Sequence, residues 1–153
     1  MSKEIVFREK KEKKLQKSRW SLYEIDPSNQ INHLLGIDNF LALQSHIKEK
    51  IRNYKSQDIR KKRYCPEHFI DFEFIKSLLL FHQLRCFYCQ TQLRLCYNDH
   101  RDMIQWSIER IDNLYGHNTD NVVISCLQCN LNRNSSTSVN FLKTKRLCIS
   151  KIG

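Results

Sequence analysis

The sequence predicts an α+β fold in which a small metal-stapled module, a β-hairpin plus a helix, follows an N-terminal helical extension. Two Cys-x-x-Cys pairs bracket residues 86–129, two β-forming runs lie between them, and an apolar repeat typical of helices lies upstream. The chain of 153 residues is long enough for both parts. We expect a basic arm or frayed helix at 1–30, the helical extension at 31–84, and the metal module with a C-terminal helix at 85–153.

The first region is polar and basic, with eight Lys or Arg against three Glu in residues 1–20. It offers few apolar side chains to bury, so an arm or a frayed helix is expected. The turn-prone segment Asp26-Pro27-Ser28-Asn29 separates it from the helical extension. A second basic run at 48–63 holds eight Lys or Arg against two acids, so the rest of this +10 chain is nearly neutral. Electrostatic binding of a polyanion would therefore depend mainly on these two basic segments.

An amphipathic helix is expected from Asp38 onward, because apolar side chains recur at steps of three and four. These are Phe40, Leu43, Ile47, Ile51 and Tyr54. Lys48, Arg52 and Lys55 share another face, a basic stripe that could follow a phosphate backbone. The stripe could equally be only the solvated side of the helix.

A second helix is expected after Pro66, with Asp71 as its N-cap. Phe74, Leu78 and Phe81 would line its core-facing side. Beyond it we expect a tight cysteine turn at 86–89, strands at 106–111 and 122–125, and a helix at about 127–134. Such a turn, hairpin and helix around one zinc ion form the treble-clef arrangement, in which metal binding contributes on the order of 10 kcal/mol to folding.

Four cysteines, Cys86, Cys89, Cys126 and Cys129, have the spacing of a closed tetrahedral Zn²⁺ site. Two disulfides or core thiols are the alternative. Seven cysteines without a secretory signal favour reduced thiols, with Cys65, Cys96 and Cys148 left as ordinary thiols. Cys65 and His68 have the spacing of half a zinc site, but no second half lies nearby. The longest apolar run, 78–81, is too short to span a bilayer, so we expect a soluble intracellular protein without a membrane partner.

The segment between and after the cysteine pairs carries a further pattern. It reads Ile108-Glu109-Arg110-Ile111-Asp112-Asn113, then Gly116-His117, Asp120-Asn121-Val122, and Cys126-Leu127-Gln128-Cys129-Asn130-Leu131-Asn132-Arg133. Over about residues 86–141 this resembles the zinc-containing HNH nucleases of the ββα-metal superfamily, particularly the HNH-like proteins of large DNA viruses and phages. The resemblance implies a treble-clef zinc scaffold that carries a nuclease site.

The resemblance also implies roles for individual residues. Asn121 would bond loop backbone and fix the hairpin, while Glu109 and Asn130 would hold a catalytic Mg²⁺ or Mn²⁺. Arg133 would hold a phosphate. For Glu109 and Asn130 the alternative is a surface acid and a helix-capping amide.

Arg110 stands where the family usually has its histidine general base. Arginine stays protonated and cannot accept a proton from water, although it could clamp the phosphate. Another base is then needed, and the candidates are His117, His100 and Asp112. We prefer His117 because an unperturbed imidazole has a suitable pKa. The alternative role for His117 is that of a turn residue that donates to a backbone carbonyl.

We therefore expect a metal-dependent endonuclease or nickase of HNH type that acts on double-stranded DNA, held by the basic upstream helices. The main alternative is a nucleic-acid-binding zinc protein that has lost hydrolysis, which Arg110 favours. A structural or protein-interaction zinc module is the third possibility.

Overall fold

The computed structural model describes residues 18–38, 40–134 and 136–146. These form α1 (Leu22–Ile25), α2 (Pro27–Leu35), α3 (Phe40–Arg60), α4 (Phe72–Phe81), β1 (Trp106–Arg110), β2 (Val122–Cys126), α5 (Leu127–Arg133) and α6 (Ser138–Arg146). Most of the expected basic arm, residues 1–17, and Cys148 lie outside the described residues. No described helix combines the length and the apolar character that crossing a bilayer requires.

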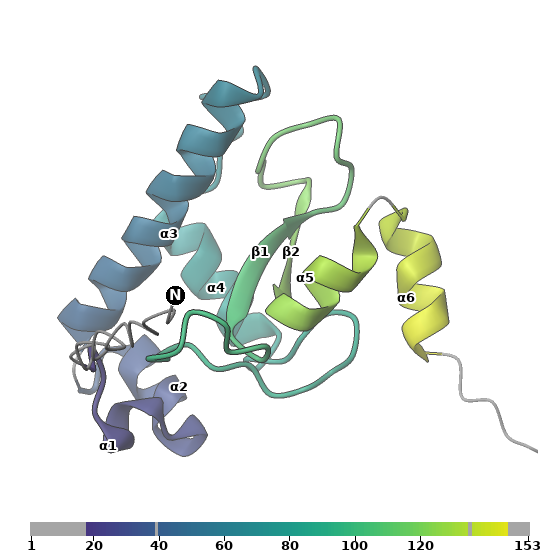
Figure 1. The fold of residues 1–153 in the computed structure, drawn as a ribbon. Helices are drawn as coiled ribbons and strands as arrows, with labels where there is room; N and C mark the ends of the chain where they lie inside the picture. The colour runs from purple at the N-terminus through teal and green to yellow at the C-terminus, as the bar shows by residue number, and fades with distance from the viewer. Residues whose placement is uncertain (1–17, 39, 135, 147–153) are drawn as a thin grey trace, which may run out of the picture.

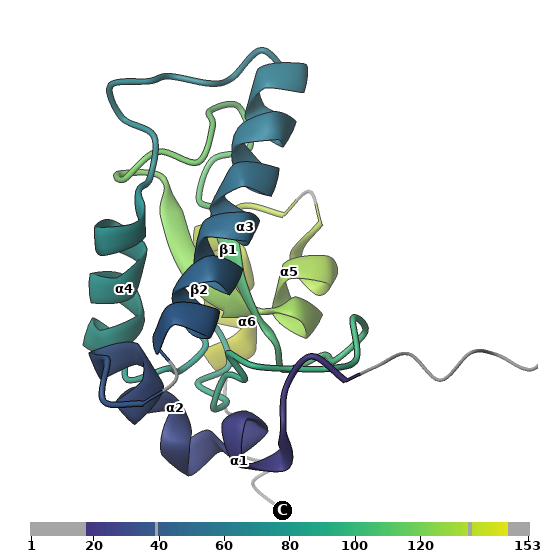
Figure 2. The same ribbon diagram turned by 90° about the vertical axis from the view of Figure 1, so that its left-hand side faces the viewer.

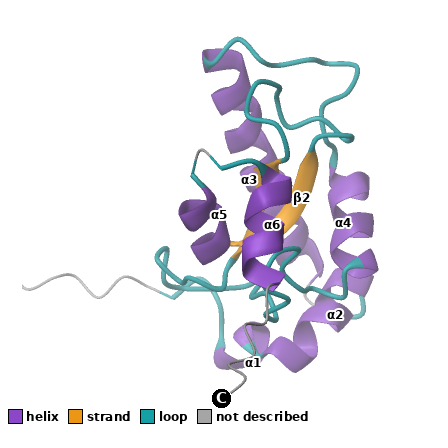
Figure 3. Cartoon of the chain, turned by 90° about the vertical axis from the view of Figure 1, so that its right-hand side faces the viewer, coloured by secondary structure: helices purple, strands orange, loops and turns teal. Residues whose placement is uncertain are grey.

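The antiparallel hairpin of β1 and β2 lies at the centre, with helices around it (Figures 1 and 2). α3 lies on one side of the hairpin and α6 on the opposite side, while α4 and α5 occupy the other two (Figures 1 and 3). Ile108 pairs with Ile124, and Glu109 with Val123. The two expected strands and the mixed α+β class are thus confirmed.

The segment that begins at Asp26 is not a turn between regions but the start of α2. The Asp26 side chain accepts a hydrogen bond from the Ser28 backbone N–H (2.9 Å), and Pro27 occupies the first helical turn. Aspartate at the N-cap followed by proline is a helix-start signal, and here it outweighs the turn preference of the same residues.

α3 is confirmed as an amphipathic helix and is anchored to β1. Leu43 and Ile47 are buried, and the Tyr54 hydroxyl accepts a hydrogen bond from the Ile108 backbone N–H (3.1 Å). Lys50 belongs to the basic run, yet its ammonium donates to the Trp106 carbonyl and lies over that indole ring. Part of the basic run therefore serves internal packing.

α4 begins as predicted, since the Asp71 carboxylate accepts a hydrogen bond from the Phe74 backbone N–H (2.8 Å). Its predicted core face was wrong at Phe81, whose exposed fraction is 81%. Ile75 and Leu79, each one position after a predicted core residue, are fully buried instead. One residue turns a helix by about 100°, and docking on the hairpin selects the aliphatic side.

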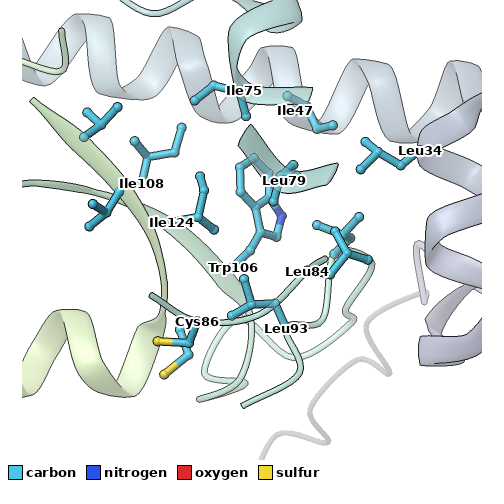
Figure 4. Close-up of a cluster of buried hydrophobic side chains, with 14 of the residues drawn as sticks. Leu34, Ile47, Ile75, Leu79, Leu84, Cys86, Leu93, Trp106, Ile108 and Ile124 are labelled. Carbon is cyan, nitrogen blue, oxygen red and sulfur yellow. The ribbon is translucent and has the colours of Figure 1, made fainter. Parts of the chain in front are cut away.

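The helical extension and the metal module share one hydrophobic cluster. Figure 4 shows Ile47 of α3, Leu79 of α4 and Ile108 of β1 converging on Trp106, with Cys86 at the edge of the cluster. Since residues from both regions are fully buried in it, the described fold rests on an ordinary core in addition to the cysteine cluster.

His46 on α3 is buried in an aromatic environment. Its ring centroid lies 5.7 Å from that of Trp20 and 5.3 Å from that of Tyr97. Neither ring nitrogen has a hydrogen-bond partner among the described residues. Burial, with a smaller contribution from Lys50, lowers the pKa of His46 to about 4. The neutral imidazole therefore acts as an aromatic packing residue.

This burial predicts a pH-dependent stability that His46→Phe removes. Because the native pKa lies below the unfolded value of about 6.5, the unfolded chain binds more protons between pH 6.5 and 4, and the free energy of unfolding falls as pH falls through that window. Phenylalanine keeps an aromatic ring at this position, and no hydrogen bond is lost because neither nitrogen of His46 makes one among the described residues. We expect its advantage over the wild type to grow by on the order of 2 kcal/mol across the window.

Urea unfolding at a series of pH values measures this difference. Both proteins carry the same cysteines, so any acid-induced loss of metal cancels in the comparison. Parallel stability curves would contradict the buried neutral state of His46.

Candidate functional site

The four paired cysteines come together from two places in the chain. Cys86 and Cys89 lie in a tight turn after α4, which the hydrogen bond from the Cys86 backbone N–H to the Thr91 carbonyl (2.9 Å) closes. Cys126 ends β2 and caps α5, because its sulfur accepts a bond from the Cys129 backbone N–H (3.4 Å). The turn thus directs one pair, and the junction of β2 and α5 directs the other, toward one point.

The sulfur geometry suits a zinc ion. All four Sγ atoms lie within 4.8 Å of one another, and those of Cys89 and Cys126 are 3.8 Å apart. Tetrahedral coordination with Zn–S bonds of about 2.3 Å places sulfurs about 3.8 Å apart, whereas a disulfide requires about 2.05 Å. The four cysteines can therefore hold one metal ion, as the sequence predicted, and they are not paired as disulfides.

The acidities of these thiols differ because the sulfurs interact. The hydrogen bond from Cys126 lowers the pKa of Cys86, whereas burial and then the charge of Cys86 raise the pKa of Cys129. Ionisation of one thiol in the cluster thus disfavours ionisation of the neighbouring thiols. A dication at the centre would offset this repulsion and allow all four to ionise.

A pocket of about 340 Å³ opens beside the hairpin, between α3 and α5. Its lining residues are Tyr54 and Gln57 of α3, Ile108, Glu109 and Arg110 of β1, Asn113 and His117 of the hairpin loop, and Asn130, Leu131 and Asn134 in and after α5. Glu109, Arg110, His117 and Asn130, which the resemblance and the search for a base singled out, all lie in this one pocket.

Glu109 faces α5 and is buried in an ion pair. Its Oε1 accepts a hydrogen bond from Arg133 Nη1 (2.9 Å), and its Oε2 has no partner among the described residues. Burial raises the pKa of Glu109, although the bond from Arg133 opposes that shift. The buried Oε2 of Glu109 could therefore bind a ligand only if that ligand enters the pocket.

Arg133 is not placed to hold a phosphate, contrary to the sequence-based expectation. Its side chain is 2% exposed, and the guanidinium donates to Glu109, to the Arg110 and Ile111 carbonyls, and to the Ser136 carbonyl. Each guanidinium nitrogen is already engaged inside the protein. Arg133 instead fastens the end of β1 to α5.

Asn130 and Asn121 are both oriented by hydrogen bonds. Asn130 Nδ2 donates to Ser107 Oγ (3.2 Å), which leaves its amide oxygen without a partner among the described residues. Asn121 Nδ2 donates to the Asp112 and Gly116 carbonyls, both at 3.0 Å, and its Oδ1 accepts from the Asp112 N–H. Asn121 therefore supports the loop backbone, as the resemblance implied.

Arg110 also supports the loop. Its Nη1 donates to the Asn113 carbonyl (3.1 Å) and the Tyr115 carbonyl (3.2 Å). Burial and, to a lesser extent, the charge of Arg63 lower the pKa of Arg110. A guanidinium still remains protonated at physiological pH, so it is no proton acceptor.

The three candidate bases lie in different places. His100 is exposed and borders a separate pocket beside Trp20. The Asp112 carboxylate accepts from the Leu114 backbone N–H (2.8 Å) and faces other cavities. Of the three, His117 alone lines the pocket with Glu109.

His117 does not donate to a backbone carbonyl, the alternative considered from sequence. Its Nδ1 lies 2.9 Å from Oδ1 of Asp58, a residue of α3 that sequence analysis did not single out. The signal was present, because Asp58 continues the apolar series of Ile47, Ile51 and Tyr54 at helical spacing. An acid on a buried helix face needs a partner.

The basic stripe lies away from the pocket. Lys48, Arg52 and Lys55 are exposed, with the Lys48 and Lys55 ammonium groups over the Phe72 and Tyr64 rings. At 100° per residue they fall on a different flank of α3 from Gln57, which lines the pocket. Figure 2 shows α3 between α4 and α5. Because the Lys48 ammonium lies over the ring of Phe72, the first residue of α4, this end of the stripe is on the α4 side.

Comparison with protein-family models, curated proteins and solved structures gives no match to this chain. The structure by itself establishes a mixed α+β fold with a cluster of four cysteines that could hold a metal ion.

Proposed function

We propose that the chain is a metal-dependent endonuclease or nickase of HNH type that hydrolyses DNA phosphodiester bonds. The observation that carries this proposal is the single pocket in which Glu109, Arg110, His117 and Asn130 meet. They come from a strand, a loop and a helix, so their proximity is a result of folding. Phosphodiester hydrolysis uses a general base, a cationic side chain and oxygen ligands for a metal ion. His117 would be the base, Arg110 the cationic side chain, and Glu109 and Asn130 the oxygen ligands.

Glu109 and Asn130 would hold Mg²⁺ or Mn²⁺. A carboxylate oxygen and an amide oxygen are hard ligands that suit these ions. The unpartnered Oε2 of Glu109 and the amide oxygen of Asn130 supply them. When bound, the ion would stabilise charge on the leaving 3′-oxygen.

His117 and Arg110 would act on the other side of the phosphate. A water proton passes to the neutral His117 as the water oxygen bonds to phosphorus, the P–O3′ bond breaks, and the 3′-oxygen takes a proton from solvent. Arg110 keeps its positive charge and binds the phosphate oxygens. Double-stranded DNA is the proposed partner.

A non-hydrolytic nucleic-acid-binding protein is the second candidate. The buried Glu109–Arg133 ion pair favours it, because a carboxylate bonded to arginine is a weaker cation ligand. In that case the zinc scaffold and Arg110 would serve binding alone.

A supercoiled-plasmid assay with Mg²⁺ or Mn²⁺ decides between them. We expect the zinc-loaded wild type to nick the plasmid only with added metal, and Asn130→Ala to reduce the rate about 10²-fold or more. Asn140→Ala, on the exposed face of α6, is the matched control and should retain the wild-type rate. Glu109→Ala is less suitable, since it also leaves Arg133 unpaired.

Absence of metal-dependent nicking by folded wild-type protein would leave the binding candidate. Equal rates for Asn130→Ala and the control would remove Asn130 from the metal site.

A further inference from the structure

The end of α3 and the hairpin loop meet at one buried carboxylate. The Asp58 side chain is 2% exposed, and it accepts two hydrogen bonds from a single loop residue. Oδ2 accepts from the His117 backbone N–H (2.7 Å), and Oδ1 pairs with His117 Nδ1 (2.9 Å). One bond fixes the backbone of His117, and the other fixes its ring.

This approach is close enough to require glycine at position 116. A Cβ atom there would lie 2.5 Å from the Arg63 carbonyl oxygen and 2.7 Å from Asp58 Oδ2. The Tyr54 ring lies 4.5 Å from the His117 ring and supports it from α3. The imidazole is therefore held by α3, a helix outside the segment that carries the nuclease-like pattern.

The contact determines which ring nitrogen carries the proton. A carboxylate only accepts hydrogen bonds, so the Nδ1 of neutral His117 must be the protonated nitrogen, and Nε2 must hold the lone pair. Nε2 has no partner among the described residues, and His117 lines the pocket with Glu109 and Asn130. We propose that Asp58 is a positioning residue that fixes the tautomer of His117 and so makes Nε2 the proton acceptor of the pocket.

This inference rests on the proposed function for its catalytic consequence. Asp58 and Tyr54 from α3 and Arg110 from β1 are the titratable groups that face His117. Burial lowers the pKa of His117 most, Asp58 raises it and Arg110 lowers it further. The ring is therefore neutral and able to accept a proton near pH 7, and Asp58 stabilises the imidazolium that forms.

Asp58→Asn tests the assignment, because an amide has only one acceptor atom. The backbone N–H of His117 is an obligate donor and takes the amide oxygen, so the amide NH₂ faces Nδ1 and donates to it. The proton of neutral His117 is then forced to Nε2. We expect nicking to fall about 10²-fold or more with little change in KM, because the ring offers the wrong nitrogen.

A matched control exists in the same chain. His33 Nδ1 lies 2.6 Å from Asp38 Oδ1, in a second histidine–aspartate pair whose residues are outside the pocket lining. Asp38→Asn alters that pair and should leave the nicking rate as in the wild type. A general effect of altering a histidine–aspartate pair would appear in both variants.

Long-range ¹H–¹⁵N spectra of the full-length, zinc-loaded proteins report the tautomer directly. We expect Nδ1–H for His117 in the wild type and Nε2–H in Asp58→Asn. An Nε2–H tautomer in the wild type would overturn the proposal, and this readout does not depend on the variant's folding. Unchanged nicking by folded Asp58→Asn would also overturn it. Wild-type protein with the expected tautomer but no nicking would contradict the proposed nuclease while the positioning by Asp58 stands.

Discussion

Cys126→Ser is expected to abolish zinc binding and unfold the C-terminal half of the protein. Serine retains an N-cap oxygen for α5 and a similar size, so the change isolates the loss of one thiolate. Structural zinc contributes on the order of 10 kcal/mol, which is comparable to the whole stability of a domain. Metal analysis should show much less than one zinc per chain, and circular dichroism should show loss of the cooperative thermal transition.

Cys65→Ser is the matched control for this loss. Cys65 is half-buried, lies outside the cluster and donates its S–H to Glu67 (3.3 Å). It should retain one zinc per chain and a melting curve close to that of the wild type. A zinc-free Cys126→Ser protein that melts like the wild type would show that the hydrophobic core alone carries the fold.

Arg133→Met is expected to cost about 3–5 kcal/mol of unfolding free energy. It leaves the buried Glu109 carboxylate without its cation and removes the donors to the Ile111 and Ser136 carbonyls. Arg52→Met, an exposed change on α3, should alter stability by less than about 0.5 kcal/mol. Urea unfolding of both variants measures the contrast.

A second substitution separates the charge from the packing. Adding Glu109→Gln to Arg133→Met removes the uncompensated carboxylate, so the double variant should recover part of the lost stability. Equal stability of Arg133→Met and Arg52→Met would mean that the ion pair contributes nothing. A metal ion could then replace Arg133 at Glu109 without loss of stability, and the ion pair would no longer favour the non-hydrolytic candidate.

Features coded by adjacent residues could be predicted from the sequence. The cysteine pairs, the strands and the Asp71 cap depend on spacing and local propensity, and the structure confirms all of them. Local signals also compete. At Asp26 the same residues encode a turn or a helix start, and packing of α2 against α3 accompanies the helical outcome.

Features that depend on docking could not be predicted. Phe81 and Ile75 are equally apolar in sequence, and only the orientation of α4 against the hairpin decides which is buried. The Asp58–His117 contact joins residues 59 positions apart in the sequence. Arg133 points into the protein because Glu109 and backbone carbonyls that lie far from it in the sequence accept its hydrogen bonds.

The central claim is that four cysteine sulfurs bind one zinc ion, on which the hairpin, α5 and the pocket are organised. X-ray absorption spectroscopy at the zinc edge on purified full-length protein tests it most directly. The claim predicts one zinc per chain with four sulfur neighbours at about 2.3 Å. A folded protein without zinc, or a zinc shell that contains nitrogen or oxygen in place of these sulfurs, would contradict it.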